Sequence, residues 1–222
     1  MNVVSTLQVL NQLWMPECHA PDEAEYDYIV VGAGTAGAPV AVRIAQNRTA
    51  KVLLIEAGGD PQLENYFPGL VVFTQSSLID YNFTTTQKRY TKQCRQDGDF
   101  ILHAGKVLGG SSSFNLMVYE RGNERDYESW VTASNNPHWS LNNTLKYFKR
   151  TEKLEDQEIL NSPYREYHGV DGPLIVTKEN RTEIDKYIVA FEELGKLSVI
   201  DLNSNETLGF TKTQYTIRDD RQ

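Results

Sequence analysis

The spacing of apolar residues along the chain predicts a strand, a helix and a second strand near the N-terminus. Residues 28–31 and 51–56 are short apolar runs that stop at or beside glycine, a pattern typical of strands buried on both faces. Between them, residues 36–46 place apolar side chains at helical spacing, with Pro39 in the first turn, where a missing N–H is tolerated. These elements form a βαβ unit with two parallel strands.

The pattern is weaker after residue 60. Short strands are expected around Val71 and Phe83, with no long helix before residue 101. Residues 105–122 are rich in glycine and serine and fit neither the helical nor the strand period.

Two further helices and a strand are predicted downstream. Ser140 is expected to cap a helix that runs to residue 149, and Thr182 to cap one that ends at Gly195. The apolar stripes of both helices are expected to face a core. Residues 210–217 resemble a strand, after which the chain stops without a terminating element, so we interpret it as cut.

Composition indicates a globular, soluble chain. Of its 222 residues, 40% are apolar and 23% are charged, and the formal net charge is -8. No cluster of lysine and arginine is longer than a dipeptide, which argues against nucleic acid or an anionic membrane surface as a partner. No apolar run approaches the roughly 20 residues that a transmembrane helix needs.

Cysteine and histidine do not suggest a metal site. Cys18 and Cys94 can make at most one bridge, and the sequence leaves open whether they pair. The four histidines are isolated, with no spacing that places two imidazoles on one helical face, so no metal is expected.

Glycosylation signals favour a secreted protein, although no typical signal peptide is readable in residues 1–16. The chain contains five Asn-x-Ser/Thr sequons, whereas its asparagines would give about two by chance. These sequons are at Asn47, Asn82, Asn142, Asn180 and Asn205.

The turn of the βαβ unit carries the sequence GAGTAG at residues 32–37, a GxGxxG motif between a strand and a helix. The first glycine permits the tight turn, the second lets the backbone approach a pyrophosphate, and the third allows close packing of helix and strand. Glu56 ends the second strand, where an acid accepts hydrogen bonds from an adenosine ribose and repels the 2′-phosphate of NADP. The alternative is a glycine turn that packs without a ligand.

A second glycine-rich segment, residues 105–115, separates flavin from nicotinamide cofactors. It offers backbone donors, three hydroxyls, an amide and one cation, which together suit an anion-binding nest that could reach a flavin ring. In isolation, a flexible loop is the other interpretation. The chain has no P-loop, and residues 109–113 do not form the GxSxG nucleophile elbow of hydrolases.

Three stretches together resemble a known family, the glucose-methanol-choline (GMC) oxidoreductases, with the closest wording in the arthropod glucose-dehydrogenase-like branch. They read DYIVVGAGTAGAPVA, LLIEAGG and GKVLGGSSSFNLMVYERGNERDYESW. The resemblance implies an α/β fold, with a Rossmann-like FAD-binding βαβ domain followed by the beginning of an α+β substrate domain. The domains implied are a leader at residues 1–25, the FAD-binding domain at 26–160 and a truncated substrate domain at 161–222.

The resemblance also implies FAD as the cofactor and suggests which residues contact it. Those on the pyrophosphate side are Gly32, Gly34, Thr35, Ala36 and Gly37, with Glu56 at the adenosine ribose. Those that follow the cofactor toward the flavin are Lys106, Gly109, Gly110, Ser111, Asn115 and Val118.

The chain departs from the family pattern at two places in this segment. His103-Ala104 replaces a usual Pro-Arg and removes a cation, and Phe114 replaces a usual aliphatic residue. Some relatives tether FAD through a nearby histidine, but the spacing from His103 to Gly109 is one residue short, so covalent attachment is not expected. No partner that would orient His103 is apparent from the sequence.

By resemblance, the general-base histidine lies beyond this chain, so no catalytic residue is expected within it. We interpret the chain as the FAD-binding portion of an oxidoreductase that moves a hydride from a CH–OH group of an alcohol or sugar to flavin N5, with oxygen or a quinone as electron acceptor. A truncated, non-catalytic flavin-binding fragment or decoy is the alternative. An NAD-binding module is disfavoured by residues 105–115.

Overall fold

The computed structural model describes residue 20 and residues 24–85, 100–206 and 208–218. The chain divides into two compact units, Met1–Leu116 with Arg221–Gln222, and Met117–Asp220. Most of the expected leader, and both Cys18 and Cys94, lie outside the described residues. The expected division into an FAD-binding domain at 26–160 and a substrate domain from 161 stays a prediction.

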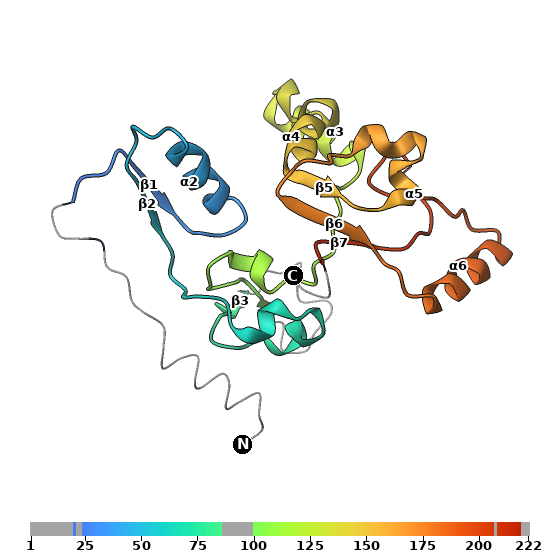
Figure 1. The fold of residues 1–222 in the computed structure, drawn as a ribbon, viewed down its shortest axis with the longest axis horizontal. Coiled ribbons are helices and arrows are strands. Elements are labelled where there is room, and N and C mark those ends of the chain that lie inside the picture. The colour runs from blue at the N-terminus through green and yellow to red at the C-terminus, as the bar shows by residue number, and fades with distance from the viewer. Residues whose placement is uncertain (1–19, 21–23, 86–99, 207, 219–222) are drawn as a thin grey trace, which may run out of the picture. The chain divides into compact units, whose positions relative to one another are not determined.

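The first unit contains the predicted βαβ motif, which is drawn in blue in Figure 1. Strand β1 (Tyr28–Val31) pairs in parallel with β2 (Val52–Ile55), and helix α2 (Gly37–Ala45) connects them. The register runs from Tyr28 opposite Val52 to Val31 opposite Ile55. The predicted elements and their parallel pairing are therefore confirmed.

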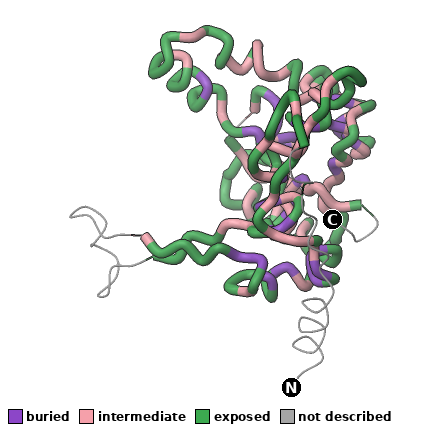
Figure 2. The backbone as a smooth tube through the Cα atoms, turned by 90° about the vertical axis from the view of Figure 1, so that its left-hand side faces the viewer, coloured by how far each residue is buried: buried purple, intermediate pink, exposed green. Residues whose placement is uncertain are grey.

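The prediction that these strands are buried on both faces is wrong for the described chain. Ile29 is 60% exposed and Val31 is 80% exposed. The sheet has two strands among the described residues, and α2 packs beside them, but much of its apolar surface remains uncovered. Figure 2 shows the same pattern, with buried residues confined to short stretches between exposed ones.

The rest of the first unit consists of short elements around a small core of Ile79, Val107 and Phe114. They are the 3₁₀ helices η1 (Leu63–Tyr66), η2 (Pro68–Phe73) and η3 (Gly110–Ser113), and the antiparallel strands β3 (Phe83–Thr84) and β4 (Ile101–Leu102). The strand expected at Phe83 is confirmed. The strand expected at Val71 is wrong, because Pro68 opens a 3₁₀ turn and the Val71 carbonyl accepts hydrogen bonds from both the amide and the hydroxyl of Thr74.

The second unit surrounds a three-stranded sheet in the order β5-β6-β7, with β5 and β6 parallel and β6 and β7 antiparallel. Its apolar core is Leu154, Ile159 and Val176. The elements are α3 (Glu124–Ser134), η4 (Pro137–Trp139), α4 (Leu141–Thr151), β5 (Glu152–Leu154), α5 (Gln157–Leu160), η5 (Pro163–Tyr167), β6 (Leu174–Lys178), α6 (Glu183–Glu193) and β7 (Gln214–Tyr215). None of the helices among the described residues is long and apolar enough to cross a membrane.

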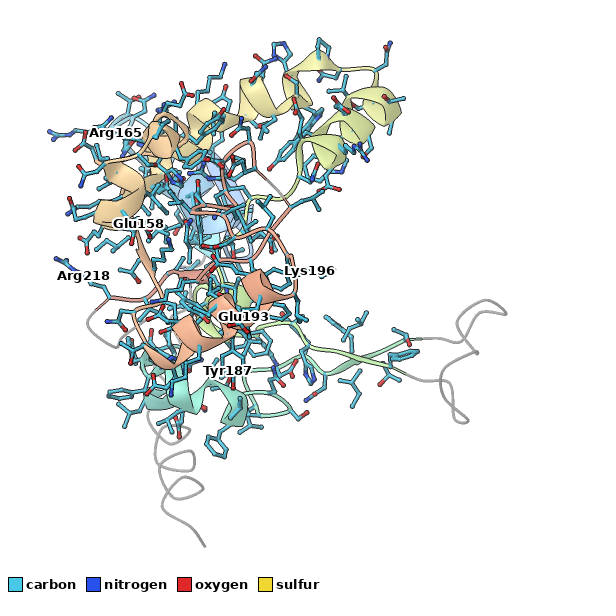
Figure 3. The ribbon with its side chains drawn as sticks, turned by 90° about the vertical axis from the view of Figure 1, so that its right-hand side faces the viewer. Glu158, Arg165, Tyr187, Glu193, Lys196 and Arg218 are labelled. Atoms are coloured by element: carbon cyan, nitrogen blue, oxygen red, sulfur yellow. The ribbon has the colours of Figure 1, made fainter. Side chains whose placement is uncertain are left out.

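The two predicted helices are present as α4 and α6, although neither Ser140 nor Thr182 makes the expected capping hydrogen bond. No residue of α6 is fully buried, and Leu194 is 72% exposed, so the predicted core stripe is only half covered. Tyr187, Glu193 and Lys196 project outward from this helix and the turn after it (Figure 3). A capping box of Asn123 and Asp126 opens α3, and this signal was readable in the sequence.

Candidate functional site

The turn between β1 and α2 requires glycine at both ends. Gly32 has φ +96°, a backbone conformation that favours glycine, and its N–H donates to Ile55 O at 2.7 Å. A Cβ atom on Gly37 would lie 1.8 Å from the carbonyl oxygen of Gly32. The first and last glycines of the motif therefore serve the fold directly, whether or not a ligand is present.

The middle glycine is different, because space is open beside it. A Cβ atom on Gly34 would meet only the Cα of Gly110, at an ordinary contact distance of 3.7 Å. Helix α2 begins next to it, and neither a side-chain cap at Ala36 nor an acidic residue in the first turn neutralises the positive helix end. The diphosphate of a dinucleotide fits this position.

Glu56 is held in place by two backbone amides. Its Oε2 accepts a hydrogen bond from the N–H of Ala33 at 2.7 Å, and its Oε1 accepts one from Gly58 at 3.0 Å. A carboxylate oxygen can accept more than one hydrogen bond, so a ribose hydroxyl fits the capacity that remains. The residue thus joins the glycine turn to the end of β2 and keeps acceptor capacity for a ligand.

The second glycine-rich segment lies directly against the first. Gly109 donates its N–H to Ala33 O at 2.8 Å, and Leu108 donates to Gly59 O at 2.8 Å. A Cβ atom on Gly110 would come within 2.8 Å of the Gly34 Cα, and one on Gly58 within 2.1 Å of Lys106 backbone atoms. Glycines at 32–37, at 58–59 and at 105–110 therefore allow backbone to pack on backbone. The structure thus brings together three loops that are remote in sequence.

The serines of this segment organise the loop itself. Ser111 Oγ accepts from the N–H of Gly105 at 3.1 Å, while Ser112 and Ser113 donate to the carbonyls of Gly109 and Leu108 at 2.6 and 2.7 Å. These bonds accompany the 3₁₀ turn η3, whereas whether the loop is flexible stays open. The hydroxyls of Ser112 and Ser113 are used within the loop, and the backbone N–H groups of Leu108, Gly109 and Gly110 also donate to carbonyls of the protein.

His103 has an orienting partner that the sequence analysis did not find. Its Nδ1 lies 2.5 Å from Oδ2 of Asp80, a side chain with no solvent exposure, while 35% of the His103 side chain is exposed. Asp80 also accepts the backbone N–H groups of Ser76, Asn82 and Ala104. Burial alone would raise the pKa of Asp80, but these hydrogen bonds outweigh it and lower the pKa to about 2.

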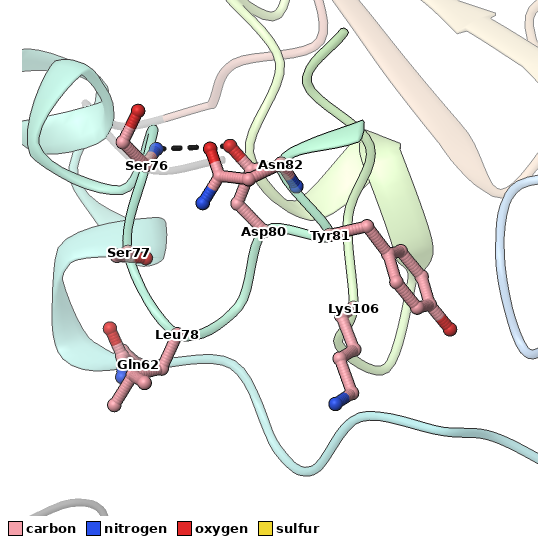
Figure 4. A pocket seen from close by; sticks show the side chains of 8 residues that line it. All are labelled: Gln62, Ser76, Ser77, Leu78, Asp80, Tyr81, Asn82 and Lys106. Carbon is pink, nitrogen blue, oxygen red and sulfur yellow. Dashed lines mark hydrogen bonds between the residues drawn. The ribbon is translucent and has the colours of Figure 1, made fainter. Parts of the chain in front are cut away.

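The backbone and the side chain of Lys106 have different surroundings. Its backbone packs on Gly58, whereas its side chain faces a hollow of about 510 Å³ (Figure 4), with Nζ 5.9 Å from the centre of the Tyr81 ring. The other lining residues are Gln62, Ser76, Ser77, Leu78, Asp80 and Asn82. The cofactor contact expected of the Lys106 side chain therefore stays a prediction.

The remaining expected cofactor residues are Thr35 and Ala36 in the first turn, Asn115 just after η3, and Val118. Val118 belongs to the second unit, where it forms a bridge with Tyr215. The roles of these residues toward FAD stay predictions. Across the described ranges, no group of three or more His, Cys, Asp or Glu side chains is arranged to hold a metal ion.

Comparison with known proteins places this site in a family. The profile described as GMC oxidoreductase matches residues 26–222. Ecdysone oxidase from Bombyx mori is 37% identical over 217 residues, which cover 96% of this chain and 32% of the relative. Glucose dehydrogenase [FAD, quinone] from Drosophila melanogaster is 40% identical over 196 residues, or 87% of this chain and 31% of the relative.

A solved structure supports the same assignment. Pyridoxine 4-oxidase from Mesorbium loti superposes with a TM-score of 0.78 and 29% sequence identity, over 89% of this chain and 38% of that protein. The chain spans about a third of the length of the curated relatives it matches. The predicted family, its N-terminal location and the α/β fold class are confirmed, and the chain belongs to the GMC oxidoreductase family.

Proposed function

We propose that this chain is the FAD-binding portion of an FAD-dependent oxidoreductase that acts on a CH–OH group of an alcohol or sugar. The observation that carries the proposal is the packing of two glycine-rich loops around an open position at Gly34. When bound, FAD supplies the group that accepts a hydride. The chain supplies the binding surface for it.

Each part of the site has a task in this proposal. The turn at residues 32–37 and the uncapped start of α2 hold the diphosphate, and Glu56 accepts from the adenosine ribose. Gly109, Gly110 and Ser111 continue the surface, since their loop is fixed against Ala33 and Gly34. Lys106, Asn115 and Val118 are assigned to the flavin-side part of the cofactor on the family resemblance.

The names of the relatives support the substrate class and the acceptor. Ecdysone oxidase and glucose dehydrogenase [FAD, quinone] carry out oxidations, and the latter name includes a quinone. We therefore assign a small-molecule alcohol or sugar as substrate and oxygen or a quinone as electron acceptor of the whole protein. The alternative, a non-catalytic flavin-binding fragment, shares the same site.

The test of the cofactor is direct. The purified chain is incubated with FAD or NAD and desalted, and flavin absorbance is measured in the protein and in its supernatant after denaturation. We expect retention of FAD and none of NAD. A protein that retains NAD and no FAD would show that the site has been assigned to the wrong dinucleotide.

The chain alone is expected to show no measurable oxidation of glucose, choline or simple primary alcohols with a dye acceptor. A missing positioned base costs about 10²–10⁴-fold, and loss of substrate orientation adds to it. A longer parent protein serves as the positive control. Steady dye reduction by the chain, lost in His103→Ala, would show that His103 with Asp80 acts as the base and that the chain is a complete enzyme.

We also propose that the protein is secreted and glycosylated, and its five sequon asparagines support this. All five are exposed, and their side-chain Nδ2 atoms make no hydrogen bond within the described ranges. Asn65, Asn143 and Asn203, which lie outside sequons, each donate from Nδ2 to the fold. A sugar on a sequon nitrogen would therefore displace no hydrogen bond of the fold.

Glycosidase treatment of the insect-cell product is expected to increase its gel mobility. A variant with Thr144→Ala, which removes only the Asn142 sequon, should show a smaller shift than the wild type. Unchanged mobility of the wild-type protein on treatment would count against both glycosylation and the secretory route.

A further inference from the structure

The second unit is built around a group of buried charges that the proposed function does not use. We call it the His168 cluster; it comprises Arg121, Glu152, His168 and Asp201. The side chains of Glu152 and His168 have no solvent exposure, that of Arg121 is 2% exposed, and Asp201 as a residue is fully buried. Its members come from four separate segments of the unit, including the first residue of β5.

Both nitrogens of the His168 ring face carboxylates. Nδ1 lies 3.0 Å from Oε1 of Glu152, and Nε2 lies 2.9 Å from Oδ2 of Asp201. A neutral imidazole has one N–H, so one of these two contacts would then set a lone pair against an anionic oxygen. An imidazolium donates in both directions and satisfies both contacts.

Other donors also point at both carboxylates, so each of them accepts hydrogen bonds at both of its oxygens. Glu152 Oε2 accepts from Arg121 Nη2 at 2.5 Å and from the N–H of Gly169 at 2.7 Å. Asp201 Oδ1 accepts from the N–H of Asn203 at 2.9 Å and from Gln214 Nε2 at 2.5 Å. With His168 protonated, two positive and two negative charges cancel inside the unit. Without the proton, a buried negative charge is left uncompensated, which is costly.

We propose that His168 carries a proton throughout the neutral range and that the loss of this proton at alkaline pH opens the second unit. The segments that would separate first are the start of β5 and residues 199–204, because His168 contacts Glu152 in one and Asp201 in the other. Gln214 of β7 donates a hydrogen bond to Asp201 and would be affected with the second segment. The device is a pH-sensitive conformational switch built into the fold.

The electrostatics of His168 determine the direction in which stability changes with pH. Burial acts to lower the pKa of His168, but the hydrogen bonds and charges of Asp201 and Glu152 outweigh it and raise the pKa above 6.5. A raised folded-state pKa means that the stabilisation is complete below the unfolded value and is lost as pH rises through the folded value. Asp201 has a lowered pKa, so its contribution is lost at the acidic end instead. Other ionisable groups lie near the cluster. Burial raises the pKa values of Tyr119 and Tyr127, and a hydrogen bond with Glu206 raises that of Tyr164. Lys178 of β6 donates from Nζ to the carbonyl of Ile200, next to Asp201.

The experiment is hydrogen exchange of the whole chain as a function of pH, read on peptides that cover residues 152–154 and 199–204. After correction for intrinsic base-catalysed exchange, the opening constant should rise by up to tenfold per pH unit between the unfolded pKa of about 6.5 and the raised folded pKa of His168, and should level off above the folded value. The variant His168→Gln/Asp201→Asn restores charge neutrality without a titrating group, and its opening constant should not change over this range. His138→Gln, at an exposed position of the same unit, should behave as wild type.

A second measurement uses only the wild-type protein and therefore does not depend on whether the variants fold. In the wild-type protein, histidine labelled with ¹⁵N should show a proton on both ring nitrogens of His168 at pH 7.5. A single ring proton at that pH, or a wild-type opening constant that does not rise with pH, would overturn the proposal. Because neither readout involves flavin, a failure here is distinguishable from a failure of the proposed FAD site.

Discussion

Gly34→Val is expected to abolish FAD retention while the protein stays folded. A Cβ atom at this position meets only the Gly110 Cα at 3.7 Å, so the fold has room for the start of a side chain. The cofactor has none, because the diphosphate must approach the backbone at the second glycine. The measurement is flavin absorbance after desalting, with circular dichroism to confirm folding, and the milder Gly34→Ala should weaken retention.

The matched comparison is Gly37→Ala, which should fail for another reason. Its Cβ would lie 1.8 Å from a backbone oxygen of Gly32, so the turn itself must shift. We expect destabilisation at or above the about 1–3 kcal/mol that is usual for overpacking, seen in unfolding as well as in flavin loss. Lys106→Ala, which shortens a side chain that faces the hollow, should only reduce retention. Full FAD occupancy in Gly34→Val would refute the assignment of the site.

Arg121→Met is expected to destabilise the second unit by about 3–5 kcal/mol, because it removes one partner of a buried ion pair. Arg121 Nη2 donates to Glu152, Nη1 donates to Tyr167 O at 2.6 Å, and its backbone N–H donates to Asn203 Oδ1 at 2.8 Å. The substitution keeps the backbone bond and the bulk of the side chain but leaves Glu152 and Asp201 with one cation between them. Urea unfolding followed by tryptophan fluorescence measures the loss.

The control is Arg125→Met on the exposed side of α3 in the same unit, which should change stability by less than about 0.5 kcal/mol. The double variant Arg121→Met/Glu152→Gln removes both charges and should recover part of the loss. If Arg121→Met were no more harmful than Arg125→Met, the cluster would not hold the unit together.

Local pattern was enough to predict the parts of this protein that depend on near neighbours in the sequence. The strands at residues 28–31 and 51–56, the helix between them and the glycine turn follow from apolar spacing and from what glycine allows. The helices at α4 and α6 were predicted for the same reason. The sequence motifs also predicted the family, because three glycine-containing stretches occur in the same order as in its members.

Burial and polar partners could not be predicted in this way, because they depend on which distant segments meet. The sequence of β1 reads as a doubly buried strand, yet Val31 is 80% exposed, since burial depends on what covers the sheet. Likewise, nothing in the spacing of Asp80 and His103 predicts that His103 Nδ1 lies 2.5 Å from Asp80 Oδ2, beside the antiparallel pair of β3 and β4.

By itself, then, the sequence determined the βαβ unit, its glycine turn and the GMC family, since each depends on residues adjacent in the chain or on fixed motifs. Only the tertiary structure decided that Gly109 pairs with Gly34. It also decided that a Cβ atom at position 110 would lie 2.8 Å from the Gly34 Cα, so that glycine is favoured there. It also decided that Arg121, Glu152, His168 and Asp201 meet in one buried cluster. The physical reason is the same in each case: close packing and charge compensation act between atoms brought together by folding, whereas residue spacing records only local geometry.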